Sequence, residues 1–146
     1  MQLNTKCRYA VLAMVDIANY AKSKPCNLSH IAIRQNISLS YLEQIFNKLR
    51  KSNLVESLRG PGGGYKLVKS STEIKISEII NAVDENIQAT GCGNNPKSFC
   101  TGKSEKCLTH SFWSDLEKLI ANYFDSVVLS DIANGKKSNI TELNHQ

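Results

Sequence analysis

Apolar residues at helical spacing mark three successive elements in the first third of the chain. Residues 3–21 and 28–35 each carry apolar residues three and four apart, and Pro25 lies in the polar stretch between them. The clearest stripe follows the letters SLSYLEQ, where apolar residues stand at i, i+3, i+4 and i+7: Leu42, Ile45, Phe46 and Leu49. This pattern predicts three helices.

The second and third of these helices are separated by only a few residues, with the letters NIS between them. Asn36 is a residue type that tolerates left-handed backbone, which suits a tight turn. Ser40 and, three residues later, Glu43 form the pattern of a capping box and predict the start of the third helix. Two short helices around such a turn are typical of a helix-turn-helix.

A short β-hairpin is predicted directly after the third helix. Residues 54–58 and 65–68 have the composition of two strands, and the letters RGPGGGY supply the loop between them. The glycines of that loop allow its backbone to approach another surface closely. A basic hairpin that follows a helix-turn-helix is the pattern of a winged helix.

Two further helical regions are predicted downstream. Residues 76–85 carry isoleucines and a valine on one face, and residues 110–134 form a longer apolar segment. In the longer segment the apolar positions alternate by three and four, the rhythm of a helix that pairs with a partner, although packing against its own domain fits the same pattern. The candidate dimerisation residues are Trp113, Leu116, Ile120, Tyr123 and Val127, with Phe112, Leu119 and Phe124 beside them.

These elements predict a mainly α-helical fold with a small β-hairpin wing. The expected organisation is a winged helix-turn-helix domain over residues 1–84 and a cysteine-rich loop over residues 85–110. A long dimerisation helix and a short C-terminal helix follow over residues 111–134, and then a flexible tail over residues 135–146. At 146 residues the chain fits one modest domain with an appended helix for self-association.

Charge is distributed unevenly along the chain. Residues 1–70 hold 11 Lys and Arg against 3 Asp and Glu, a net +8, whereas residues 71–146 hold 7 against 10, a net −3. A basic N-terminal half favours a polyanionic partner. Together with the helix-turn-helix and the wing, this asymmetry predicts binding to double-stranded DNA.

Short polar side chains on the third helix suit the edges of bases. Gln44 matches adenine, and Glu43 matches cytosine while repelling phosphates. The basic residues at the end of this helix suit phosphates, and Arg59 at the base of the glycine-rich loop suits a narrow minor groove. The candidate DNA-binding residues are Ser38, Ser40, Tyr41, Glu43, Gln44, Lys48, Arg50, Lys51, Arg59 and Gly60.

The sequence also indicates the cellular location of the protein and the class of activity to expect. The N-terminal residues include Lys6, Arg8 and Asp16, so we expect neither a signal peptide nor a membrane span, and we expect a cytoplasmic protein. Five cysteines, an odd number, then favour reduced thiols or metal ligands over a disulfide framework. No acid–base pair with an oxyanion pocket is recognisable, so we do not expect an enzyme.

Soft ligands are concentrated in the stretch CGNNPKSFCTGKSEKCLTH. Its spacing is C-x7-C-x6-C-x2-H, formed by Cys92, Cys100, Cys107 and His110. Three thiolates and one imidazole suit either zinc or an iron–sulphur cluster. Structural zinc sites usually carry a tight C-x2-4-C knuckle, which is absent here, so the wide gaps favour a cluster. A metal-free thiol redox switch is a third possibility, since nearby lysines lower thiol pKa values.

Several motifs occur in an order that is specific to one bacterial family. KCRYAVLAMVDIA, SYLEQ, RGPGGGY and CLTH resemble the IscR-like iron–sulphur cluster regulators, and the resemblance covers roughly residues 1–134. It implies a homodimeric winged-helix transcription factor, repressor and activator, that binds promoter sites. It also implies a 2Fe–2S cluster, with zinc as the alternative, on Cys92, Cys100, Cys107 and His110.

The resemblance further implies how such a regulator works. The cluster-loaded form represses the genes for cluster assembly, including the regulator's own gene, and the cluster-free form binds a second class of promoters. The position of Glu43 discriminates between the two classes of site, Ser40 and Gln44 match positions of the reading helix, and Arg59 matches the wing residue. Two departures are visible: the gaps between the cysteines are longer here, and Cys7 stands where relatives generally have Gly.

Overall fold

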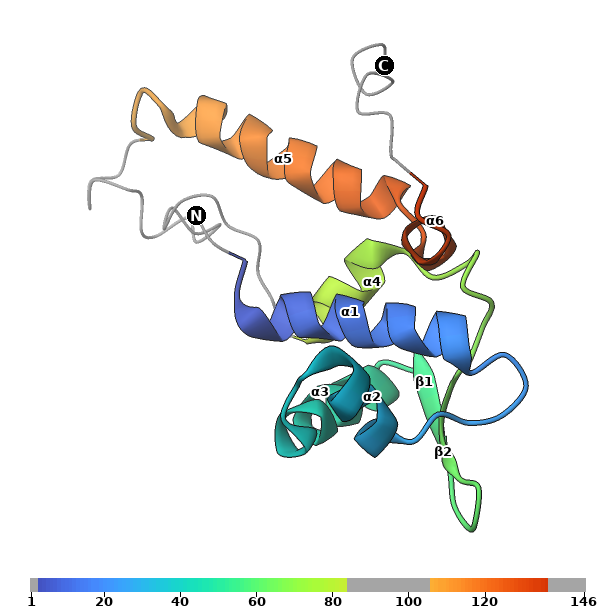
Figure 1. The fold of residues 1–146 in the computed structure, drawn as a ribbon. Coiled ribbons are helices and arrows are strands. Elements are labelled where there is room, and N and C mark those ends of the chain that lie inside the picture. Colours follow the sequence, from blue (N-terminus) through green and yellow to red (C-terminus); the bar gives the residue numbers. More distant parts are fainter. Residues whose placement is uncertain (1–2, 84–105, 137–146) are drawn as a thin grey trace.

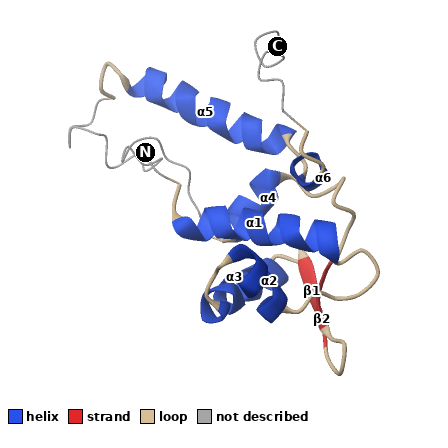
Figure 2. Cartoon of the chain, in the orientation of Figure 1, coloured by secondary structure: helices blue, strands red, loops and turns tan. Residues whose placement is uncertain are grey.

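The computed structural model describes residues 3–83 and 106–136 as six helices and one antiparallel hairpin (Figures 1 and 2). The elements are α1 Thr5–Tyr20, α2 Leu28–Gln35, α3 Leu39–Lys51, β1 Val55–Leu58, β2 Gly64–Leu67, α4 Ile76–Ala82, α5 His110–Ser126 and α6 Leu129–Ala133. The predicted fold class, a mainly helical winged helix, is confirmed. None of the helices in these described ranges is both long and apolar enough to cross a membrane.

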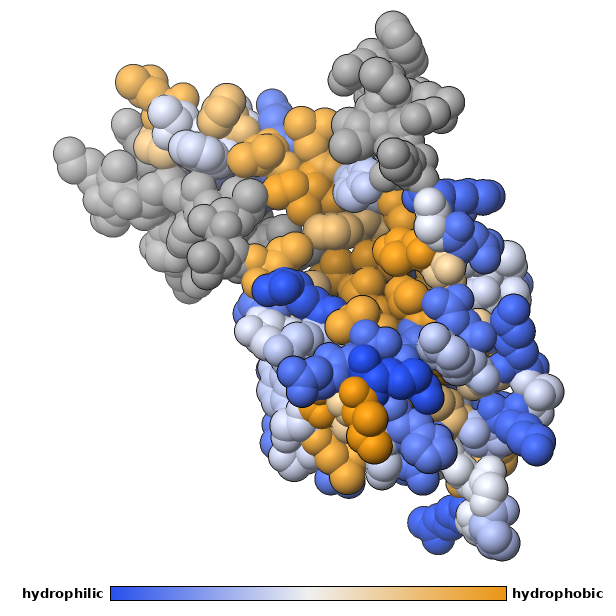
Figure 3. Space-filling model, in the orientation of Figure 1, coloured by the Kyte–Doolittle hydropathy of each residue, from blue (hydrophilic) through white to orange (hydrophobic). Residues whose placement is uncertain are grey.

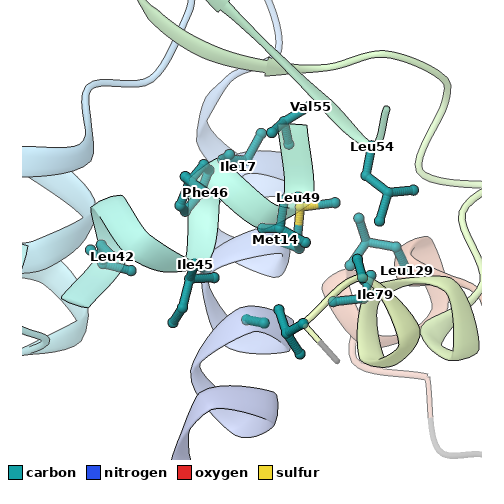
Figure 4. Packing of buried hydrophobic residues seen from close by; sticks show 14 of the residues in the cluster. Met14, Ile17, Leu42, Ile45, Phe46, Leu49, Leu54, Val55, Ile79 and Leu129 are labelled. Carbon is teal, nitrogen blue, oxygen red and sulfur yellow. The ribbon is translucent and has the colours of Figure 1, made fainter. Parts of the chain in front are cut away.

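A single hydrophobic core joins the helix-turn-helix to the rest of the domain. The stripe predicted on α3 forms its centre, because Leu42, Ile45, Phe46 and Leu49 are all at most 1% exposed. Figure 4 shows Phe46 beside Ile17 and Leu49 beside Met14, with Ile17 and Met14 both from α1, and the same cluster includes Val55 from β1 and Leu129 from α6. The N- and C-terminal elements therefore share one core, since α6 packs against α1.

The turn between α2 and α3 has the predicted left-handed residue. Asn36 adopts φ 53° and ψ 49° as the C-cap of α2. The next residue, Ile37, is buried and anchors the turn. α3 then begins at Leu39 with Ser38 as N-cap, so the capping box predicted from Ser40 is wrong. Ser40 already lies inside the helix, and its hydroxyl lies 3.0 Å from that of Ser38.

The wing is held to the helix-turn-helix by main-chain and aromatic contacts. β1 and β2 pair in antiparallel register from Val55–Leu67 to Leu58–Gly64. Beyond the hairpin, Cys26 and Tyr65 exchange two backbone hydrogen bonds of 2.8 Å, which adds a bridge from the loop before α2. The Tyr65 ring also meets the Phe46 ring edge-on, with centroids 4.9 Å apart. The position of the wing is thus fixed from two sides.

Gly64 is required at this bridge because the two backbones approach closely. A Cβ at residue 64 would stand 2.5 Å from the Cys26 carbonyl oxygen, which cannot move aside without breaking the bridge. We expect Gly64→Ala to lower the free energy of unfolding by about 2 kcal/mol or more, measured by urea denaturation. The matched control is Gly62→Ala, which has positive φ but no neighbour within 4 Å, and should cost only about 1 kcal/mol. Equal losses in the two variants would contradict this reading of Gly64.

The segment that follows the wing is joined to the C-terminal helices. Ile76 donates its backbone N–H to the Val127 carbonyl at 2.9 Å, and Leu129 donates to the Ile74 carbonyl at 2.8 Å. Side chains add to the joint, since Asp125 accepts hydrogen bonds from Lys75 at 2.9 Å and Ser77 at 3.0 Å. The Lys75 bond, followed by that of Ser77, lowers the pKa of Asp125. The C-terminal end of α5 is therefore fixed to α4.

The rest of α5 extends away from the core (Figure 1). None of its 17 residues is buried. Phe112 and Leu119 are 64% and 60% exposed, and Trp113 is 36% exposed. Figure 3 shows apolar surface along this helix and on the body below it. An exposed apolar helix face of this kind is a feature of interaction surfaces rather than of a free monomer.

The predicted dimerisation residues do not all lie on this exposed face. α5 ends at Ser126, and Val127 follows in extended conformation, 9% exposed in the core of its own chain. Tyr123 is partly buried and packs against the same core. Leu116 and Ile120 are partly buried, between these and the exposed Trp113. The predicted stripe is therefore divided, with its C-terminal part used within the chain.

Candidate nucleic-acid interface and metal centre

α3 presents a polar face opposite its buried stripe. Ser40, Glu43 and Gln44 are exposed on this face, as predicted for a reading helix. Arg50 and Lys51 are exposed in its last turn, and Arg50 donates a 3.3 Å hydrogen bond to the side chain of Asn47. Short polar groups thus lie toward the start of the helix and cations at its end, which suits base edges and phosphates respectively.

Two of the predicted DNA-binding residues are partly occupied within the protein. Tyr41 is partly buried, and its ring meets Tyr9 of α1 edge-on with centroids 5.8 Å apart. Lys48 is also partly buried. Tyr41 therefore has a packing role as well, whereas Ser38 at the helix start is exposed.

The wing loop carries Arg59 and Gly60 at the exposed end of the hairpin. Gly60 adopts φ 105° and accepts a 2.9 Å hydrogen bond from the backbone N–H of Gly63, which closes the loop. A Cβ at Gly63 would stand 2.3 Å from the Leu58 carbonyl oxygen, so the tip cannot contain a larger residue there. The loop is consequently narrow, with a single cation at its base.

Two of the four predicted metal ligands lie at the start of α5. The backbone N–H of His110 donates to the Cys107 carbonyl at 3.1 Å, which folds the two residues into one turn. Both residues are partly exposed, and the Cys107 sulphur lies 3.5 Å from the hydroxyl of Thr109. A cysteine and a histidine in one solvent-accessible turn are donor types that fit either an iron–sulphur cluster or zinc.

Cys92 and Cys100 lie outside the described residues. Within residues 3–83 and 106–136, no group of three or more Cys, His, Asp or Glu side chains is arranged to hold a metal ion. Cys7 and Cys26, expected to be ordinary small apolar residues, are 2% and 7% exposed and belong to the core. Along the sequence, both residues lie far from the loop that carries the predicted ligands.

A polar network beside the helix-turn-helix was not anticipated from the sequence. Asp16 of α1 is 2% exposed and accepts three hydrogen bonds. Arg34 donates two of them, at 3.0 and 2.7 Å, and Gln35 donates the third at 2.8 Å. The bond to Asp16 is the main cause that raises the pKa of the Arg34 guanidinium. The available signal was a lone carboxylate within an apolar helix, since buried charges in proteins are normally paired.

A helix-turn-helix with an exposed polar reading helix, followed by a glycine-rich wing, defines a winged-helix DNA-binding protein. Residues 3–135 match the Rrf2 family, described as iron-dependent transcriptional regulators. The chain belongs to the Rrf2 family, and it is a transcriptional regulator rather than an enzyme.

Curated relatives with high identity are named HTH-type transcriptional regulator IscR. The protein of Pectobacterium carotovorum is 47% identical over 137 residues, which cover 94% of this chain and 82% of that relative. The protein of Escherichia coli O1:K1 is 46% identical over 137 residues, covering 94% and 83%. The resemblance inferred from the motifs is thus confirmed at the level of the family.

Solved structures agree with this assignment. T. potens IscR superposes with a TM-score of 0.76 and 32% identity, covering 98% of this chain and 96% of that one. CymR, the global cysteine regulator of B. subtilis, superposes with a TM-score of 0.77 and 28% identity, covering 94% and 99%. The winged-helix architecture is therefore shared by regulators that are named for different roles.

Proposed function

We propose that the protein is a cytoplasmic, homodimeric regulator that senses iron–sulphur cluster status and controls genes for cluster assembly, including its own. The observation that carries the proposal is the Cys107–His110 turn at the start of α5, the helix proposed to pair the two subunits. The high identity to regulators named IscR supports it. A zinc-stabilised or thiol-redox regulator without a cluster is the alternative.

The four proposed ligands are Cys92, Cys100, Cys107 and His110, with a 2Fe–2S cluster as the proposed cofactor. Such a cluster supplies a redox-labile and iron-dependent group. His110 would contribute a neutral imidazole, which is protonatable and a weaker ligand than a thiolate. His110 and Cys107 belong to the first turn of α5 and the residues before it, so these two residues would connect the bound group directly to the N-terminal end of that helix.

The reading surface is proposed to be the exposed face of α3 together with the wing. Ser40, Glu43 and Gln44 would contact base edges in the major groove, and Arg59 the adjacent minor groove. Arg50 and Lys51 would contact phosphates, which give affinity without sequence information. The remaining proposed contacts are Ser38, Tyr41, Lys48 and Gly60.

The first experiment is an absorption spectrum with iron, sulphide and zinc analysis on protein purified without oxygen. Visible bands with about two irons and two sulphides per chain support the cluster. A colourless protein with about one zinc per chain makes the loop structural. A colourless protein without metal whose DNA binding changes with thiol oxidation supports the thiol switch.

His110→Ala is expected to lose its cluster faster than the wild-type protein on exposure to air, because one of four ligands is removed. Binding to promoters that the cluster-free form recognises should be unchanged. The matched control is His30→Ala, an exposed histidine on α2 that should leave cluster loss unchanged. Loss of all DNA binding in His110→Ala would contradict the separation of cluster binding from DNA reading.

Glu43→Ala is expected to relax the choice between DNA sites. The exposed Glu43 carboxylate accepts a hydrogen bond from cytosine and repels phosphates, so its removal should change relative affinities by about fivefold or more. Competition between two duplexes, followed by fluorescence anisotropy, measures this ratio. Glu73→Ala removes an exposed carboxylate outside the reading surface and serves as control. An unchanged ratio in Glu43→Ala would remove Glu43 from the reading residues.

A further inference from the structure

We propose that Arg34 is a positioning residue that sets the wing relative to the reading helix. The inference rests on the DNA-binding role of α3 and of the wing. It is drawn from the network around the guanidinium, which joins three parts of the fold: α1, the end of α2 and the loop that pairs with the wing.

The first connection fixes Arg34 to α1. Its guanidinium donates to both oxygens of Asp16, at 2.7 and 3.0 Å, and the Asp16 side chain is fully buried whereas that of Arg34 is 30% exposed. The same guanidinium lies over the ring of Tyr20, the last residue of α1, at 4.5 Å. A two-point ion pair and a stacked ring together fix both the position and the plane of the guanidinium.

The second connection runs from Arg34 to the wing. Its Nη2 donates to the sulphur of Cys26 at 3.2 Å. The backbone of Cys26 in turn exchanges two hydrogen bonds with Tyr65 of β2, next to Gly64. Nη2 therefore joins α1 to the residue that bridges to the wing strand, and the second bond to Asp16, from Nε, holds the plane of the guanidinium.

The third connection is to the reading helix through the chain itself. Arg34 lies in the last turn of α2, followed by Gln35, which donates to Asp16 at 2.8 Å, and by the left-handed Asn36 that leads into α3. The network thus fixes the point at which α3 leaves α2. Because the same guanidinium also supports the wing, it sets the angle between the major-groove and minor-groove elements.

The test is a double-mutant cycle on DNA affinity between Arg34→Lys and Arg59→Ala. Lysine retains the charge but has no second nitrogen to replace Nε on Asp16 and no planar group to stack on Tyr20, so the position of the cation between Asp16 and Cys26 is no longer fixed. The probe is a duplex selected from a random library by the wild-type protein. In the wild-type background, Arg59→Ala is expected to weaken binding about tenfold. In the Arg34→Lys background the same change should cost less than about threefold, because the wing is already displaced.

The control is Arg8→Lys, the same exchange at an exposed position of α1, where the Arg59→Ala loss should stay at about tenfold. Binding is measured well below the melting temperature of every variant. Should Arg34→Lys fail to fold, Cys26→Ala takes its place, since it leaves Asp16 paired and should also shrink the Arg59→Ala loss.

Additive losses would overturn the inference, because they are the result expected if Arg34 contacts DNA directly or only stabilises the fold. That outcome, with wild-type binding intact, leaves the proposed function standing. If the wild-type protein selects no duplex, the proposed function and this inference fail together.

Discussion

A chain carrying Leu119→Glu is expected to be monomeric and to bind its DNA site about a hundredfold more weakly or worse than the wild-type dimer. Leu119 is 60% exposed on α5, on the same side of the helix as the 64% exposed Phe112, and would be buried in the proposed subunit interface. Two glutamates per dimer would lie in that interface without partners. A monomer must bind each half-site alone and loses the gain of linked binding.

The measurement is sedimentation velocity at micromolar concentration, with DNA affinity by anisotropy on the same samples. Ala121→Glu is the matched control, because it adds the same charge to the same helix at an exposed position on the opposite side. The control should stay dimeric. Dimers of unchanged stability in Leu119→Glu, or a monomeric wild-type protein, would remove α5 as the interface.

Phe46→Ala is expected to lower the free energy of unfolding by about 3–5 kcal/mol. Phe46 is fully buried at the centre of α3, and its ring contacts that of Tyr65 on the wing strand. Removing it leaves a cavity between the reading helix and the wing, and the loss is a large share of the roughly 5–15 kcal/mol of a typical domain. DNA binding should fall with it, since both reading elements share this contact.

Urea denaturation at fixed protein concentration measures this loss, because unfolding of a dimer depends on concentration. Ile33→Ala provides the comparison, since Ile33 is 79% exposed on α2 and its truncation should change stability by about 0.5 kcal/mol or less. A loss below about 1 kcal/mol for Phe46→Ala would mean that the wing is held by the Cys26 bridge alone.

The winged helix-turn-helix domain was largely predictable because the sequence features that indicate its elements are local. The period of the apolar residues on α3 identified its buried face, and the Asn at the turn and the glycines of the wing loop are residue types that those backbone conformations select. The start of α3 was misplaced at Ser40 because serines at positions 38 and 40 both suit an N-cap. In the structure Ser38 is the N-cap, and Ser40 lies one residue inside the helix start at Leu39.

The features that the sequence did not predict depend on contacts between residues far apart in the chain. Val127 continues the apolar rhythm of α5, but its carbonyl accepts from Ile76, and this contact across some fifty positions of sequence ends the helix. The Asp16–Arg34 pair and the Cys26–Tyr65 bridge likewise join separate elements. At the proposed metal site, Cys107 and His110 lie in one turn, whereas Cys92 and Cys100 lie outside the described residues.

The contacts that fix the C-terminal end of α5 to α4 affect which DNA sites the proposed dimer can bind. Ile76 donates its N–H to Val127 and the Ile74 carbonyl accepts from Leu129, directly after α5, so the helix leaves the DNA-binding domain as a rigid extension rather than on a hinge. In the proposed dimer, two such rigid helices would fix the distance and rotation between the two DNA-binding domains. Each inserted base pair turns one half-site by about 35° around the DNA axis. A hinged regulator absorbs that rotation, whereas this one would reject operators whose spacer is longer or shorter by a few base pairs, even when both half-sites are perfect.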